Sequence, residues 1–134
     1  MRSAEELFKA HLHHLTADFD AWQRLFAEDA LMEYPYGAAA GVESPLLGIA
    51  AITKSVAGFL NAVTNFRAGA PMVRQIGGED AIIAEFSADA TVVMTGRHYH
   101  QDYVVYLRAR EGKIVVLREY FDPSRVIDAF SSLR

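Results

Sequence analysis

The sequence predicts an α+β domain in which helices cover one face of a curved antiparallel sheet. Apolar residues recur at helical spacing in three stretches of the first 63 residues. From Asn65 onward the pattern changes to strand-like alternation, with turn signals at Gly77-Gly78, Thr95-Gly96 and Glu111-Gly112. Helices followed by consecutive strands are typical of the α+β class, and 134 residues is the size of one ordinary domain. We therefore expect a single domain over residues 1–134.

The helical part is expected to begin at Ser3, which can cap a helix with Glu6 as the partner of its capping box. The apolar stripe of this first helix consists of Ala4, Leu7, Phe8, His11, Leu12 and Leu15. A second helix is expected to begin at Asp18 or Asp20 and to run through Trp22, Leu25 and Phe26. The third helix is marked by Ile49, Ile52, Val56, Phe59, Leu60 and Val63.

Strands are expected in most of the remaining chain. The expected strands are 30–36, 66–76, 81–94, 99–110 and the run that contains Glu119. Small residues and a proline predict a loop over 37–48. Pro123, at the first turn of a segment that ends at Phe130, predicts a short closing helix.

Glu119 is the candidate acid of a functional site. If its run is a strand, Val115, Leu117, Glu119 and Phe121 share one face, and Val116, Arg118, Tyr120 and Asp122 share the other. A carboxylate among apolar residues is costly to bury without a partner. Either Glu119 has a structural partner, or it lines a cavity where its pKa is raised and where it handles protons. If it lines a cavity, we expect desolvation to raise its pKa above about 4.3.

A cavity is expected inside the curve of the sheet, where such folds bind ligands. Three alanines of the 81–94 strand, Ala84, Ala88 and Ala90, leave room on the inner face. The alternative is that side chains of the helices fill this room. The candidate walls are Trp22, Tyr34, Phe59, Phe86, Met94 and Phe121, a set that suits an apolar and roughly planar ligand.

Other polar residues could belong to the same site. Gln101 shares a strand face with Tyr99 and Tyr103, so its amide could orient a carbonyl or hydroxyl group of a ligand, or it could make a structural hydrogen bond within the sheet. His11 could face the cavity or be an ordinary core histidine. His98 and His100 flank Tyr99 on the opposite strand face.

Several functions are excluded by composition. The net charge is -4 and no basic patch is visible, so we expect no binding to nucleic acid. The absence of cysteine excludes disulfides and thiolate chemistry. The cluster His11, His13 and His14 has no metal-binding signature, so we expect neither a metal nor another cofactor. The polar N-terminus and the lack of an apolar run of roughly 20 residues indicate a cytoplasmic protein that does not bind membranes.

Four segments carry a family resemblance: Trp22 to Ala30, Glu33 to Gly37, Tyr99 to Val104, and Gly112 to Pro123. With the order of elements, they make the chain similar to the nuclear-transport-factor-2-like (NTF2-like) superfamily. Within it, the chain resembles SnoaL-like polyketide cyclases, ketosteroid isomerases and phenazine-biosynthesis cyclising proteins. The resemblance implies a cone-shaped, curved antiparallel sheet packed on three N-terminal helices, and a homodimer through the sheet, for which Arg118 and Tyr120 on the outer face are suited.

The resemblance also bears on individual residues. SnoaL-like cyclases carry a catalytic aspartate at the place of Glu119, and phenazine-biosynthesis relatives carry a functional glutamate in a similar run. Two positions depart from the family. Tyr34 stands where ketosteroid isomerases have their aspartate base, and a phenol with a pKa of about 10 cannot act as that base at neutral pH. Val105 stands where the cyclases place a histidine.

Three hypotheses follow. The first is a cofactor-independent enzyme that isomerises, cyclises or dehydrates an apolar cyclic or conjugated carbonyl compound. In it, Glu119 is the general acid or base, and Gln101 and Tyr103 position the polar end of the substrate. His11 and Tyr99 complete the expected ligand contacts. The second is a non-catalytic module of the same fold that binds a hydrophobic metabolite. The third is a structural dimer subunit whose cavity is filled.

Overall fold

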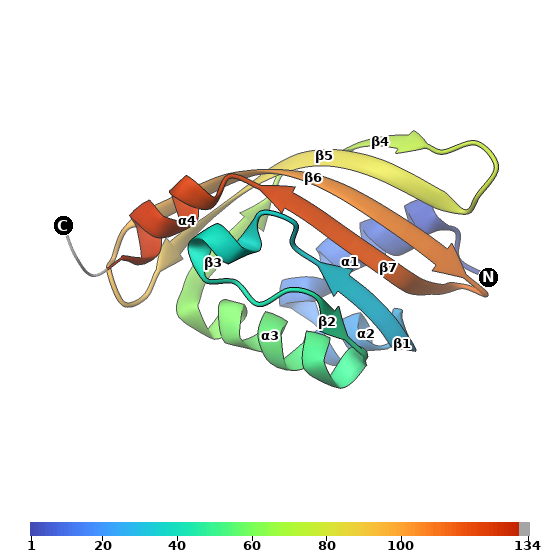
Figure 1. The fold of residues 1–134 in the computed structure, drawn as a ribbon, viewed down its shortest axis with the longest axis horizontal. Coiled ribbons are helices and arrows are strands. Elements are labelled where there is room, and N and C mark those ends of the chain that lie inside the picture. Colours follow the sequence, from blue (N-terminus) through green and yellow to red (C-terminus); the bar gives the residue numbers. More distant parts are fainter. Residues whose placement is uncertain (132–134) are drawn as a thin grey trace.

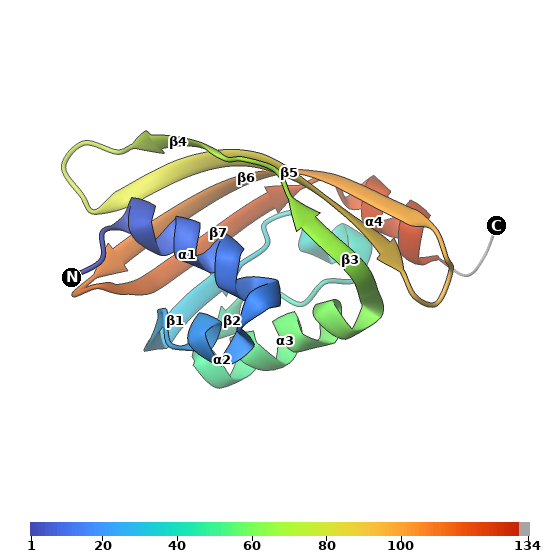
Figure 2. The same ribbon diagram turned by 180° about the vertical axis from the view of Figure 1, so that it is seen from behind.

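The computed structural model describes residues 1–131 and shows a strongly curved sheet with three helices on its concave side (Figures 1 and 2). The three helices are α1 (Ala4–Ala17), α2 (Phe19–Gln23) and α3 (Ile49–Ala62). A fourth helix, α4 (Pro123–Phe130), follows the last strand, and a 3₁₀ helix covers Gly37–Ala40. The strands are β1 (Phe26–Glu33), β2 (Leu46–Leu47), β3 (Val63–Ala68), β4 (Met72–Gln75), β5 (Ala81–Val92), β6 (His98–Arg110) and β7 (Lys113–Phe121). None of these helices is long and apolar enough to cross a membrane.

The predicted α+β architecture is confirmed. The strand order is β2-β1-β7-β6-β5-β3, and β4 also pairs with β5, as β3 does. All pairs are antiparallel except β1 with β7, which run parallel. A parallel pair needs a long connection, and here residues 34–112 connect the two strands. The first and last strands of the chain therefore lie side by side, next to the β2 end of the sheet (Figure 1).

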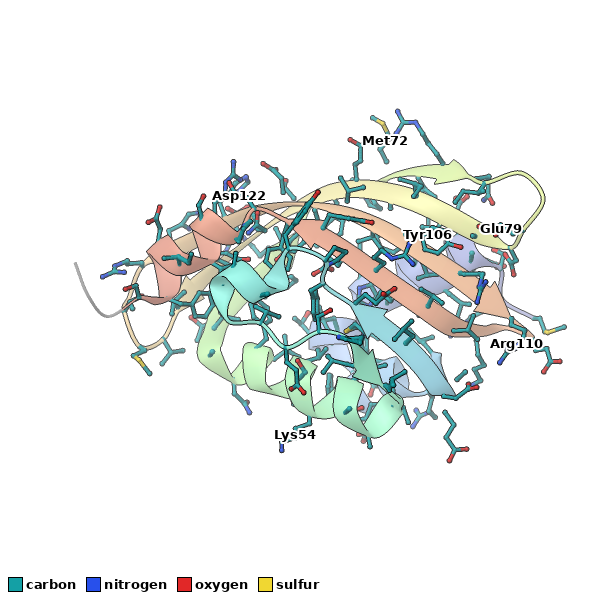
Figure 3. The ribbon with its side chains drawn as sticks, in the orientation of Figure 1. Lys54, Met72, Glu79, Tyr106, Arg110 and Asp122 are labelled. Atoms are coloured by element: carbon teal, nitrogen blue, oxygen red, sulfur yellow. The ribbon has the colours of Figure 1, made fainter. Side chains whose placement is uncertain are left out.

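The capping box of the first helix is confirmed. The Ser3 hydroxyl accepts a hydrogen bond from the Glu6 backbone N–H at 3.2 Å, and the Glu6 carboxylate accepts one from the Ser3 N–H at 3.0 Å. The closing helix lies where the proline predicted it, with Asp122 as its N-cap. Figure 3 shows Asp122 at this junction of β7 and α4.

The second helix is shorter than predicted, because Leu25 and Phe26 belong to the sheet edge. Phe26 is the first residue of β1 and pairs with Ile114 of β7. The Ile114 N–H also donates to the Leu25 carbonyl at 2.9 Å. The spacing of Trp22, Leu25 and Phe26 is compatible with a helix, but the last two residues pair with β7 instead. The strand expected over 30–36 correspondingly begins at Phe26 and ends at Glu33, two residues before Pro35.

The single strand expected over 66–76 is in fact two, β3 and β4. Both pair with β5. The Gly69 N–H still donates to the Ser87 carbonyl of β5 at 2.8 Å, and the pairing is interrupted after it, before β4 begins at Met72. Pro71 has no N–H to give to the ladder. The expected loop over 37–48 also contains more structure than predicted, namely the 3₁₀ helix and β2.

A β-bulge corrects the predicted face of β7. Arg108 of β6 pairs with Val116, whereas Ala109 pairs with Ile114, so Val115 is the extra residue. Ile114 rather than Val115 therefore joins Leu117 in the core between sheet and helices. From Leu117 onward the predicted alternation holds, and it carries Glu119 and Phe121 to the concave side.

Candidate active site

A cavity of about 420 Å³ lies between the concave face of the sheet and helices α1 to α4. This volume is within the range of about 300–1,000 Å³ that is usual for small-molecule sites. The residues that were expected in a site and that line it are His11, Trp22, Tyr34, Phe59, Phe86, Tyr99, Tyr103, Glu119 and Phe121. Side chains of the helices do not fill the space inside the cone.

The room is not made by the alanines of β5. Ala84 and Ala88 are fully packed in the main core, which they share with Leu7 and Phe8 of α1. Phe86 is the residue of β5 that reaches the cavity. Ala90 is packed in a second cluster with Val92, Tyr99 and Ala129. The prediction of a cavity was therefore right, but the alanines proposed to create it belong to the packed core.

Glu119 lies on the cavity wall without a partner. Within residues 1–131 its carboxylate makes neither a hydrogen bond nor an ion pair, and burial raises its pKa to about 7. The two arginines that could have neutralised it are engaged elsewhere. Arg118 donates to Glu33 at 3.1 Å, and Arg97 donates to backbone carbonyls near the end of α4. The expected direction of the pKa shift is confirmed.

Three phenols surround this carboxylate and remain protonated at neutral pH. Burial raises the pKa values of Tyr34, Tyr99 and Tyr103, and the negative charge of Glu119 raises them further. The Tyr34 hydroxyl donates to Met32 Sδ at 3.0 Å. The phenols are therefore hydrogen-bond donors rather than bases. For Tyr34, this agrees with the expectation that a phenol cannot act as a base at neutral pH.

Gln101 lies behind the cavity wall and not in it. Its Nε2 donates to the Asp122 carbonyl at 2.8 Å and to the Tyr99 hydroxyl at 3.1 Å. Its Oε1 accepts from the backbone N–H groups of Asp102 and Asp122, each at 3.1 Å. The amide is thus fully used in extending the β6–β7 ladder beyond its last pair and in orienting Tyr99. The structural interpretation of Gln101 accounts for all of its contacts.

Met94 is also outside the cavity. The strand ends at Val92, two residues earlier than expected, and Met94 is 84% exposed in the turn that follows. Turn residues do not continue the alternation of the strand, so the parity that placed Met94 inside does not apply there.

His11 is a buried, neutral donor at the cavity. Its Nδ1 accepts a hydrogen bond from Trp22 Nε1 at 2.7 Å, and burial lowers its pKa to about 4. The ring proton must therefore sit on Nε2. In the described chain, His14 Nδ1 is the only fully buried side-chain nitrogen or oxygen that lacks a hydrogen-bond partner. His11 Nε2 has no partner in the described chain either, so it cannot be fully buried. Because His11 lines the cavity, we take its Nε2 to be open to the cavity.

Sequence reasoning missed several residues of the cavity lining. Among them are Val126 and Phe130 of α4, which lie one helical turn apart, and Val42 and Glu43, which follow the 3₁₀ helix. The spacing of Val126 and Phe130 was a signal that could have been used, because residues four apart share a helix face. Glu43 and Glu119 are the only acids among the described lining residues, and no lysine or arginine is among them.

Comparison with known proteins finds a matching family and several similar proteins. Residues 5–117 match the SnoaL-like domain. The chain is 33% identical over 129 residues to the uncharacterized protein YesE of Bacillus subtilis, covering 96% of this chain and 87% of that protein. A crystal structure from Bacillus subtilis, described only provisionally as an isomerase, has a TM-score of 0.87 and 32% identity, with coverage of 95% and 91%. An NTF2-like protein from Burkholderia pseudomallei superposes with a TM-score of 0.83 at 17% identity, with coverage of 98% and 100%.

Proposed function

The chain belongs to the SnoaL-like domain family and has the NTF2-like fold, and on that premise we propose that it is a cofactor-independent acid–base enzyme. Its substrate is a small, apolar, cyclic or conjugated carbonyl compound. The reaction is an isomerisation, a cyclisation or a dehydration. The observation that carries this proposal is the unpartnered Glu119 carboxyl group on the wall of an aromatic cavity, with a pKa of about 7.

A pKa near neutrality allows Glu119 both to accept and to return a proton. General acid–base catalysis is most efficient when the pKa of the group lies near the working pH. The carboxylate would remove a proton from the carbon next to the carbonyl group, and the electron pair would pass to the carbonyl oxygen. The protonated Glu119 would then return the proton to a different atom of the same substrate, which completes an isomerisation.

The negative charge that develops on the substrate oxygen would be stabilised by neutral donors. Tyr99 and Tyr103 have their hydroxyl oxygens 3.4 Å apart. Because Gln101 donates to Tyr99, the Tyr99 proton can point to Tyr103, which leaves the Tyr103 proton for a ligand oxygen. His11 Nε2–H is a second neutral donor, placed at the other side of the cavity by the α1–α2 contact.

The walls determine the class of ligand. Phe86 and Tyr103 are stacked, with ring centroids 4.9 Å apart and an angle of 17° between planes. Phe59, Tyr99 and Phe121 add further aromatic surface. Since the described lining contains two acids and no lysine or arginine, an anionic ligand is disfavoured. A neutral, flat compound with one or two oxygen atoms fits these features.

A non-catalytic binding module is the second candidate, and two residues favour it. Tyr34 cannot take the role of a carboxylate base, and Val105, directly opposite Glu119 on β6, offers it no polar partner. The same cavity would then hold a hydrophobic metabolite without converting it. A purely structural subunit is disfavoured because the cavity is open.

Proton exchange distinguishes the two candidates. The protein would be incubated in D₂O with a panel of β,γ-unsaturated cyclic ketones and β-hydroxy ketones, and deuterium incorporation would be followed by NMR. We expect Glu119→Gln to lower exchange by about 10²–10⁴-fold. Glu43→Gln, the matched control at the rim, should leave exchange nearly unchanged. Binding of panel compounds without exchange, or exchange that survives Glu119→Gln, would favour the binding module.

A further inference from the structure

We propose that Asp89, His98 and His100 form a binding site for a late first-row divalent cation such as Zn²⁺, on the outer face of the sheet. This site is separate from the cavity, because the side chains of β6 alternate between the two faces. Tyr99 and Tyr103 point inward and line the cavity, whereas His98 and His100 are on the exposed side. The inference therefore goes beyond the proposed acid–base activity.

Local pairing brings the three side chains together. His98 and His100 are two residues apart on β6 and so share a face. Asp89 of β5 is the register partner of His100. Side chains directly opposite each other in an antiparallel pair have Cβ atoms about 4.5–5.5 Å apart. The sheet thus presents two imidazoles and one carboxylate on a small area of rigid backbone.

The donor atoms already converge. Asp89 Oδ1 lies 2.8 Å from His98 Nε2 and 2.9 Å from His100 Nδ1. One donor atom of each residue lies within 4.8 Å of the others. Zinc binds imidazole nitrogen at about 2.0–2.1 Å and carboxylate oxygen at about 2.0–2.2 Å, which sets ligand separations of about 3.3–3.5 Å in a tetrahedral site. Small rotations of these accessible side chains would bring the three atoms to that spacing.

A second carboxylate supports the ring of His100 from behind. His100 Nε2 lies 3.5 Å from Asp102 Oδ1. The other Asp102 oxygen accepts a hydrogen bond from Arg125 at 2.8 Å, which fixes the orientation of the carboxylate. If His100 Nδ1 binds the ion, the ring proton must be on Nε2, facing Asp102. A carboxylate behind a metal-binding histidine is the usual arrangement around such sites, and it fixes the tautomer.

The nearby cations do not block an ion at this position. Arg125 is paired with Asp102 and lies 3.6 Å from the Asp122 carboxylate. Arg97 donates to the backbone carbonyls of Asp128 and Ser131. The charge of Arg125 is therefore compensated by two carboxylates, and Arg97 is held by backbone carbonyls near the end of α4. Asp89 remains to offset the charge of the ion.

The donor set selects the class of ion. Two imidazole nitrogens and one carboxylate oxygen suit Zn²⁺, Cu²⁺ and Ni²⁺, whereas Mg²⁺ and Ca²⁺ prefer oxygen ligands alone. The fourth position faces solvent and would hold water. The expectation of no metal site considered only His11, His13 and His14 of α1, of which His11 is committed to Trp22. It did not consider the three residues assembled by β5 and β6.

Calorimetric titration of the protein, freed of metal by chelator, with Zn²⁺ tests this inference. We expect saturation at one Zn²⁺ per chain, and no comparable binding of Mg²⁺. His98→Gln, His100→Gln and Asp89→Asn should each weaken binding by at least about tenfold, and Asp102→Asn should weaken it by about 10–100-fold. Zn²⁺ should also raise the melting temperature of the wild type but not that of a His98→Gln/His100→Gln double variant.

The control is His13→Gln, which removes an exposed histidine of α1 and should leave zinc binding unchanged. Circular dichroism of the metal-free variants verifies that they are folded. Saturable binding that persists in both His98→Gln and His100→Gln, or that is lost in His13→Gln, would overturn the assignment. So would the absence of saturable binding in the wild type.

Discussion

Val105 of β6 lies directly opposite Glu119 of β7, so an aliphatic side chain is the nearest cross-strand neighbour of the cavity carboxylate. Val105 is fully buried. Nothing at this position can donate a hydrogen bond to the carboxylate, which is one reason why burial raises its pKa without compensation.

Val105→Thr should therefore lower the pKa of Glu119. The threonine hydroxyl has nearly the size of the lost methyl group and can donate to the ionised carboxylate, so the charged form gains stability. A decrease of about one unit is expected for one such bond. The measurement is an NMR titration with ¹³C-labelled glutamate. Val105→Ala, which adds no donor, is the matched control, and an equal decrease in both variants would contradict the explanation.

Glu119→Gln should stabilise the protein at alkaline pH. The pKa of Glu119 is about 7 in the folded chain, compared with about 4.3 in an unfolded one. The folded state thus binds this proton more tightly, so the free energy of unfolding falls as the pH rises through that window and is level above it. Because the group is open to the cavity, we expect the variant to gain about 1–3 kcal/mol at about pH 8.

Urea unfolding of wild type and Glu119→Gln at about pH 4 and about pH 8 measures this difference. The two proteins should differ least at the acid end, where Glu119 is mostly protonated in both states. A gain of the same size at both pH values would show that the effect comes from packing rather than from the charge.

Trp22→Phe should destabilise the chain and raise the pKa of His11. Within residues 1–131, the indole N–H is the only donor to His11 Nδ1, at 2.7 Å. Its loss leaves a buried acceptor unsatisfied, which costs about 1–3 kcal/mol. The same bond exists only with the neutral ring, so its removal makes protonation easier than at the present pKa of about 4.

A double-mutant cycle with His11→Phe isolates this bond. The double variant should be destabilised by less than the sum of the single variants, because the second change no longer breaks a hydrogen bond. NMR titration of the histidine ring gives the pKa. Strict additivity, together with an unchanged pKa, would show that the bond contributes little.

The outer face of the sheet is expected to hold a homodimer. Val104, which is 40% exposed, pairs with Tyr120 on this face, and Arg118 lies over the Tyr106 ring. Figure 3 shows Tyr106 on the same outer side. A mixture of aromatic, arginine and aliphatic groups is typical of the core of an interface.

Val104→Glu should shift the protein toward monomer in analytical ultracentrifugation, because it would place a charge among the apolar and aromatic groups of the expected interface. Met94→Glu adds the same charge at an exposed turn and should leave the association unchanged. A wild type that is only monomeric at micromolar concentration would refute the dimer.

The alternation of strands carried the sequence-based predictions farthest. It placed Glu119, Phe86 and Tyr103 on one concave face, and the structure brings them to one cavity. However, alternation predicts only on which face of the sheet a side chain lies, and not whether that side chain reaches the cavity. Gln101 shares the inward face, but at its level the β6–β7 ladder has ended, and the backbone of Asp122 uses the amide that a ligand was expected to use.

Predictions at the ends of elements were the least accurate. Met94 was assigned to a strand that ends at Val92, and Phe26 to a helix that ends at Gln23. In both cases the local pattern was compatible with either structure, and long-range pairing decided. Asp89 and His98 show the same limit, because only the register of β5 against β6 brings them together.

Trp22 gives the protein a built-in optical probe. It is the only tryptophan in the chain, it lines the cavity, and it is bonded to one of the cavity's donors. Selective excitation of tryptophan emission therefore reports from this single place. A compound that enters the cavity changes the surroundings of the indole directly, so candidate ligands can be ranked by fluorescence titration of the unlabelled protein before any reaction is known.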